Sequence, residues 1–150
     1  MSEIPPSTQE ESDVGPEALA EALRAEHAAV YGYEHIGGAA EDEDRRERAR
    51  DTAYNHKALR DALHAAAVAR GLQPPPALTS YPLAEGRDAD SVDSYAVGLE
   101  EATARAYLWL TASRDTDLRV TGARALQEAT VRALKWGAAL DALPGFDGAG

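Results

Sequence analysis

Two pairs of long helical segments, separated by a proline-rich stretch, constrain the fold of this chain more than any other feature. Apolar residues recur at the helical period through four segments, at about residues 16–40, 41–70, 90–113 and 117–143. Alanine dominates the composition, and Val and Ile are scarce, which favours helix over strand. Between the second and third segments, residues 71–90 contain Pro74-Pro75-Pro76 and Pro82 and are expected to be extended. The sequence therefore predicts an all-α domain whose connections are short, long and short.

The predicted domain covers residues 15–143, and both ends of the chain are predicted to be tails. Residues 1–14 are polar and acidic and contain Pro5-Pro6, so we expect a disordered N-terminal tail rather than a signal peptide. Residues 144–150 are rich in glycine and are expected to form a flexible C-terminal tail. Because short links join antiparallel neighbours, the pattern predicts an antiparallel four-helix bundle. One long crossover between its second and third helices is the ferritin-like version of that fold.

Charge and composition exclude several kinds of partner and chemistry. The chain of 150 residues has a net charge of −11, whereas nucleic acids and anionic membranes require a basic face. It has no cysteine, which excludes disulfides and thiolate zinc sites. No apolar run approaches the length of a membrane-spanning helix. We therefore expect a cytoplasmic protein with no nucleic-acid or membrane partner, whose aromatic and alanine-rich faces permit a homodimer.

Glu26 lies in the middle of an apolar helical stripe. Leu23, Val30 and Tyr33 stand at −3, +4 and +7 from it, so they share its helix face. A carboxylate that faces a core is costly unless another group pairs with it. Metal ions are one such partner, and helical bundles that bind iron use inward-facing Glu and His residues in this way.

A weak internal repeat relates the two helix pairs. Two alignments support it: residues 26–33 with 100–107, offset by 74 residues, and residues 55–60 with 130–135, offset by 75. The first alignment matches Glu26 and Tyr33 with Glu100 and Tyr107. Both tyrosines are expected to pack in the core with their hydroxyl groups hydrogen-bonded, and each could donate to a buried carboxylate. Such a repeat is what a duplicated helical hairpin would give.

The repeat places candidate metal ligands on all four helices. Dimetal bundles use one Glu from each of two helices and Glu-x-x-His from each of the other two. Here Glu26 and Glu100 hold the single-Glu positions. The second helix offers His56 but has Ala53 in place of the Glu, and the fourth helix offers Glu128 without the His. Three carboxylates and one imidazole favour iron or manganese.

Each candidate ligand also has an ordinary structural interpretation. Glu26 and Glu100 could be buried carboxylates hydrogen-bonded to a Tyr or Arg. His56 lies on an apolar helix face, where a lone histidine is more often a satisfied core residue. Glu128 has Arg124 and Arg132 four residues away on either side, so a surface ion pair would explain it.

With these residues the chain resembles the ferritin-like superfamily, and more closely a small bacterial ferritin-like family of unknown function. The resemblance rests on four segments: Ala25–Tyr33, His56–Leu63, Tyr81-Pro82-Leu83 and Leu99-Glu100-Glu101. It covers about residues 16–142 and implies the ferritin-like fold, but it implies no particular reaction. Ala53 and Val131 depart from the complete dimetal motif.

The sequence leaves two classes of function open. In the first, the interior cluster binds one or two iron or manganese ions and supports oxidation or storage chemistry, with an open position for oxygen or peroxide. In the second, the metal site is vestigial and the metal-free bundle is a structural or interaction module, with Glu26 and His56 paired to each other. The sequence assigns no catalytic residue, so it does not decide whether the protein is an enzyme.

Overall fold

The structure, a computed structural model, describes residues 12–140, and α-helices make up most of that span. The helices are α2 (Gly15–Ala39), α3 (Glu43–Ala69), α4 (Ala89–Leu110) and α5 (Thr116–Lys135). No strand occurs among the described residues. The predicted all-α, four-helix fold is therefore confirmed. The predicted tails at 1–14 and 144–150 lie outside the described residues, apart from residues 12–14.

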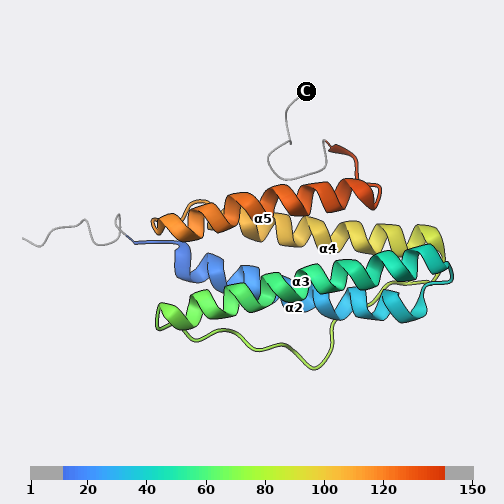
Figure 1. Ribbon diagram of the computed structural model, residues 1–150, viewed down its shortest axis with the longest axis horizontal. Coiled ribbons are helices and arrows are strands. Elements are labelled where there is room, and N and C mark those ends of the chain that lie inside the picture. The colour runs from blue at the N-terminus through green and yellow to red at the C-terminus, as the bar shows by residue number, and fades with distance from the viewer. Residues whose placement is uncertain (1–11, 141–150) are drawn as a thin grey trace, which may run out of the picture.

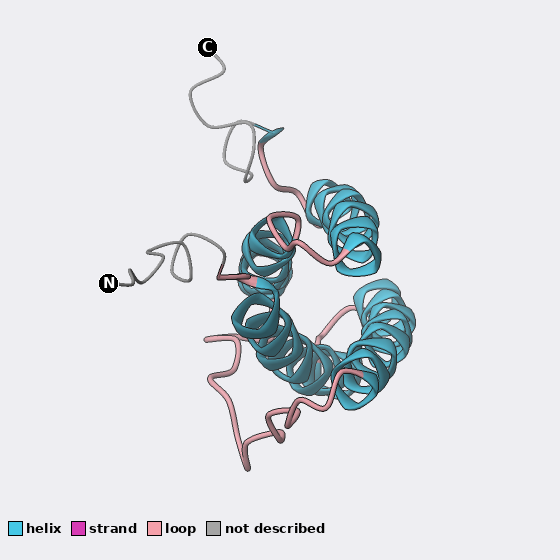
Figure 2. Ribbon diagram, turned by 90° about the vertical axis from the view of Figure 1, so that its left-hand side faces the viewer, coloured by secondary structure: helices cyan, strands magenta, loops and turns pink. Residues whose placement is uncertain are grey.

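The four helices form two antiparallel hairpins. One consists of α2 and α3 and the other of α4 and α5, and α2 also packs against α4 (Figure 1). The two outer helices, α3 and α5, do not pack closely against each other. Figure 2 looks along the helices and shows the connection between the hairpins on the outside of the bundle. Between residues 12 and 140, no helix is long and apolar enough to cross a membrane.

Aspartate side chains begin three of the helices. Asp42, Asp88 and Asp115 each accept hydrogen bonds from backbone N–H groups in the first turn of α3, α4 and α5. These N–H groups have no partner within their helix, so the caps stabilise each helix start. In α2, Pro16 stands in the first turn, where its missing N–H group costs nothing.

The end of α5 differs from the prediction, which extended this helix to about residue 143. The helix ends at Lys135, and Gly137 has a φ of +108°. The N–H of Ala138 donates to the carbonyl of Ala133 at 2.9 Å, which closes the last turn. The prediction was wrong because apolar periodicity does not register a left-handed glycine that stops a helix.

The connection between α3 and α4 follows the outside of the bundle without helix or strand (Figure 1). Two of the side-chain contacts that hold it come from the central helices. The Nε2 atom of His27 lies 3.1 Å from the carbonyl oxygen of Pro75. The hydroxyl group of Tyr95 donates to the carbonyl of Pro82 at 2.8 Å. The connection is therefore attached to both of the central helices, α2 and α4.

The core consists of two apolar clusters, separated by a polar layer. The first cluster is built around Leu19, Leu23, Leu63, Tyr107 and Leu110. The second is built around Tyr33, Ile36, Val92 and Trp136. Alanine supplies much of the rest of both clusters. Between them, the side chains of Glu26, His56 and Glu100 are fully buried.

Gly122 allows α5 to approach the backbone of α4. A Cβ atom at this position would lie 3.0 Å from the carbonyl oxygen of Tyr107 and 3.1 Å from the backbone nitrogen of Thr111. Since these backbone atoms cannot move without moving α4, Gly122→Ala is expected to lower the free energy of unfolding by about 1 kcal/mol, despite its gain in helix propensity. Urea denaturation measures the change.

Gly98, in the exposed part of α4, provides the matched control for this prediction. A Cβ atom added there meets nothing within 4 Å. Gly98→Ala is therefore expected to raise the free energy of unfolding by about 0.5–1 kcal/mol. If Gly122→Ala stabilised the protein as much as Gly98→Ala, the conclusion that α5 lies too close to α4 for a side chain at this position would be contradicted.

Candidate functional site

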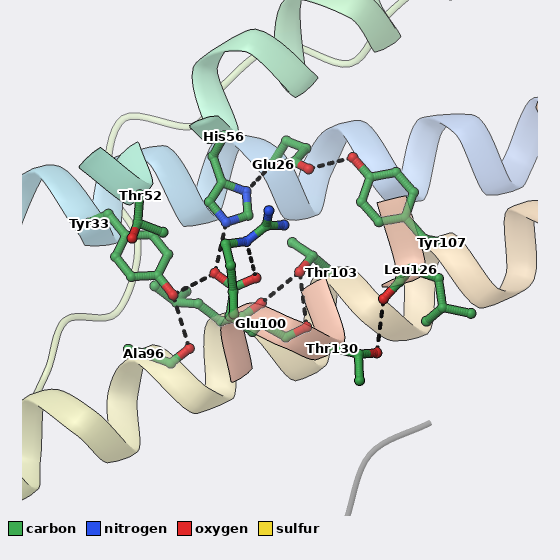
Figure 3. Close-up of polar contacts among 12 residues, drawn as sticks. Glu26, Tyr33, Thr52, His56, Ala96, Glu100, Thr103, Tyr107, Leu126 and Thr130 are labelled. Carbon is green, nitrogen blue, oxygen red and sulfur yellow. Dashed lines mark hydrogen bonds and ion pairs between the residues drawn. The ribbon is translucent and has the colours of Figure 1, made fainter. Parts of the chain in front are cut away.

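One charged side chain from each helix meets in the middle of the bundle. Glu26 comes from α2, His56 from α3, Glu100 from α4 and Arg132 from α5. The side chains of the first three are 0% exposed, and that of Arg132 is 13% exposed. Figure 3 shows the His56 ring between the two carboxylates. We call these four residues the buried ionic network.

His56 bridges the two glutamates. Its Nδ1 atom is hydrogen-bonded to Oε1 of Glu26, and its Nε2 atom lies 2.8 Å from Oε2 of Glu100. Burial alone would lower the pKa of His56. The hydrogen bonds to Glu100 and Glu26 outweigh burial and raise that pKa to about 9. The ring is therefore an imidazolium at neutral pH, and both of its N–H groups donate to carboxylates.

Two tyrosines complete the network in a crossed pattern. Tyr33 of α2 donates to Oε2 of Glu100 on α4 at 2.6 Å, and Tyr107 of α4 donates to Glu26 on α2 (Figure 3). Burial, and then the nearby carboxylates, raise the pKa of both hydroxyl groups well above its usual value, so both remain protonated donors. The prediction that these hydroxyl groups are hydrogen-bonded in the core is confirmed. Each tyrosine donates a hydrogen bond to the glutamate of the other hairpin, as expected for a pseudo-twofold repeat.

Arg132 is the member of the network that sequence reasoning missed. Its Nε atom donates to Oε1 of Glu100 at 2.9 Å. Burial would lower the pKa of the guanidinium, but Glu100 raises it overall, so the group is charged. A signal was available in the sequence. Arg132 stands three residues after Ala129 and four before Trp136, both buried, so it lies at the core-facing side of α5.

The charges of the buried ionic network balance. Burial alone would raise the pKa of Glu100, but His56, followed by Arg132 and Tyr33, holds it below its usual value. Two carboxylates, Glu26 and Glu100, face one imidazolium and one guanidinium. Four charges can be buried together in this way because each has an opposite charge within hydrogen-bonding distance.

Glu128, the fourth predicted ligand, is not part of this network. Its side chain is exposed and lines a groove of about 680 Å³ between α3 and α5, beside Val131 and Arg132. It forms no ion pair with Arg124 or Arg132 in the described part of the chain. Val131, which the repeat aligns with His56, is 49% exposed. The structure therefore unites Glu26, His56 and Glu100, and the residue that α5 adds is Arg132.

The donor atoms of the network do not fit a metal ion. Histidine binds a metal through the lone pair of a ring nitrogen. Both ring nitrogens of His56 are instead hydrogen-bonded to carboxylates. Arg132 places a positive charge against Glu100, where it would repel a metal cation. Among residues 12–140, no group of three or more His, Cys, Asp or Glu residues is arranged to hold a metal ion. In this arrangement the His56 and Arg132 cations pair with the carboxylates that a metal ion would need.

Comparisons with known proteins agree with the fold and name no activity. The profile of a family described as "Domain of unknown function (DUF4439)" matches residues 18–148. A crystal structure of a conserved hypothetical protein from Mycobacterium tuberculosis is similar to this one, with a TM-score of 0.77 and 29% sequence identity. The similarity covers 87% of this chain and 93% of that chain. No curated protein matches the sequence.

Proposed function

Because the chain belongs to the DUF4439 family, whose description assigns no activity, we propose a function from the site itself. The protein is a ferritin-like bundle that works without a metal ion, as a structural or interaction module. The buried ionic network takes the place that metal ions hold in ferritin-like proteins. The order of connections, and the packing of α2 against α4, support the ferritin-like assignment.

One observation carries this proposal: cationic side chains already occupy the carboxylates that a metal would need. His56 donates to both Glu26 and Glu100, and Arg132 donates to Glu100. A divalent ion would have to take the imidazole away from one carboxylate and deprotonate it. It would also have to sit close to the Arg132 guanidinium. Both requirements oppose metal binding.

The network supplies what the rest of the core lacks. Each helix contributes one member of the network. The network therefore fixes the rotation and the axial position of the four helices relative to one another. The apolar clusters on either side are rich in alanine, whose small side chain distinguishes poorly between alternative helix registers. A buried polar contact can select one register among several, as a single polar residue does in coiled coils. We infer that the network fixes the shape of the module.

Elemental analysis tests the proposal. We expect protein produced in iron- and manganese-supplemented medium to hold well below one equivalent of either metal. We also expect its Tm to be unchanged by added Mn²⁺ or Fe²⁺, since an ion that does not bind the folded state cannot stabilise it. About one or two equivalents in the parent, lost in a Glu26→Ala/His56→Ala double variant, would overturn the proposal and establish the metal site.

A further inference from the structure

The outer face of α5 is apolar, although the bundle does not cover it. The buried face consists of Leu118, Gly122, Ala125, Ala129 and Ala133. A second set of residues lies on the opposite face, and we call it the outer stripe: Val120, Ala123, Gln127, Val131 and Leu134. Val120 is 50% exposed, Val131 49% and Leu134 41%. A helix that is apolar on two opposite faces is expected to be covered on both.

The outer stripe is well separated from the core of the bundle. Gln127 follows the buried Ala125 by two residues, which is a rotation of about 200° around the helix axis. The stripe extends from Val120 to Leu134, a distance of about 21 Å at the rise of an α-helix. It therefore presents a straight surface of the length that another helix would cover, and two of its residues, Gln127 and Val131, also line the groove between α3 and α5.

We propose that the outer stripe packs against the outer stripe of a second copy of this chain, in antiparallel orientation about Gln127. The proposal rests on the function proposed above, and it names the partner of the interaction module. The stripe is symmetric about Gln127. Val120 and Leu134 stand seven residues from it, and Ala123 and Val131 stand four residues from it. A twofold contact therefore pairs apolar side chains on both sides of the two Gln127 residues, which meet at its centre.

Charges along one edge of the stripe select the antiparallel orientation. Four residues lie on this edge: Asp117, Arg124, Glu128 and Lys135. About a twofold axis near Gln127, Arg124 of one copy faces Glu128 of the other, and Asp117 faces Lys135. A parallel twofold contact would instead place this edge of one copy across from the opposite edge of the other, so these charges would not pair. None of the four side chains forms a salt bridge within the described part of the chain, so all are available.

The acidity of the whole chain does not prevent this contact. The net charge is −11, but the charge of α5 has the opposite sign. Apart from Arg132, which belongs to the buried ionic network, this helix carries three basic residues, Arg119, Arg124 and Lys135, and two acidic ones, Asp117 and Glu128, which gives its surface a net charge of +1. The surface of contact is therefore not the part of the molecule where the negative charge accumulates.

Sedimentation equilibrium of the full chain tests the proposal. All the substitutions below are at exposed positions, so the variants are expected to fold. We expect a dimer for the parent, and a monomer for Val131→Glu, which places charge in the middle of the contact. Glu128→Arg would set two arginines against each other twice in each dimer, and should raise the dissociation constant about tenfold or more. The exchange Arg124→Glu/Glu128→Arg restores opposite charges and should return the dissociation constant to near that of the parent.

Val68→Glu is the matched control, since Val68 is 57% exposed on α3 and outside the stripe. It should leave the dimer intact, and circular dichroism should show all variants folded. A parent that stays monomeric up to about 100 µM would overturn the proposal. So would a dimer unaffected by Val131→Glu, or one tightened by Glu128→Arg, as simple relief of net charge predicts. Metal content of the same samples is measured separately, so failure of the dimer is distinguishable from failure of the metal-free function.

Discussion

Replacing His56 with leucine is expected to lower the free energy of unfolding by about 3–5 kcal/mol. The substitution keeps a side chain of similar size but removes the cation that Glu26 and Glu100 share. Glu26 then keeps only the hydroxyl group of Tyr107, and Arg132 is left as the one cation for two buried carboxylates. For a chain of this size the loss corresponds to a fall in Tm of about 10–15 °C. Calorimetry and urea denaturation measure it.

A second substitution makes this prediction specific to charge. In the parent, Glu26→Gln should destabilise the protein, because it removes a partner of the imidazolium. In the His56→Leu background the same change should stabilise it by about 1–2 kcal/mol, because it removes an uncompensated buried charge. His64→Ala, an exposed histidine on the same helix, should change little. If Glu26→Gln had the same sign in both backgrounds, the buried ionic network would not be coupled as the structure indicates.

The fold was largely predictable because it follows from helical periodicity. Long apolar stripes, and the prolines between residues 71 and 90, identified four helices and their order. The end of α5 was not predictable in this way, because the left-handed backbone of Gly137 ended the helix, not a change in the apolar pattern. Which helices pack together also lies beyond periodicity, since each stripe shows only that a helix has a buried face.

The site was predictable where it depends on residues that interrupt an apolar stripe. Glu26 and His56 were identified in that way, Glu100 was identified by its alignment with Glu26 in the internal repeat, and the structure brings all three together. Arg132 was missed because a search for metal ligands passes over basic side chains. A buried carboxylate can be neutralised by a basic side chain as well as by a metal ion. Glu128 was included because the repeat aligns Val131 with His56. In the structure the interior position of α5 belongs to the next residue, so an alignment error of one residue turned the predicted face outward.

Raising the pH from about 6.5 to 9 is expected to lower the free energy of unfolding by an amount on the order of 3 kcal/mol. The pKa of His56 is raised from its usual 6.5 to about 9 in the folded protein. Between these pH values the unfolded chain releases a proton that the folded protein keeps. The contribution of His56 to the free energy of unfolding is therefore fully present below pH 6.5 and is lost as the pH rises toward 9. The pKa of Glu100 is lowered, so its contribution is present above its usual 4.5 and is lost at lower pH. Maximal stability is therefore expected between about pH 4.5 and 6.5.

Urea denaturation across this range, with an NMR titration of the His56 ring, checks the pH dependence directly. A ring that titrates near or below 6.5, or a free energy of unfolding that is constant up to pH 9, would contradict it. The further losses expected from the raised pKa values of Tyr33 and Tyr107 begin only above pH 10, so they do not overlap this window.

The His56→Leu variant and the pH dependence test one mechanism from two directions. Above pH 9 the parent loses the charge of His56, which is what the leucine substitution removes at every pH. The difference in stability between parent and variant should therefore be largest below pH 6.5 and should shrink by on the order of 3 kcal/mol as the pH passes 9. It should not vanish, because a neutral imidazole still donates one hydrogen bond to a carboxylate. A difference that stayed constant with pH would mean that His56 stabilises the bundle by its shape alone, and the network would then have no ionic role.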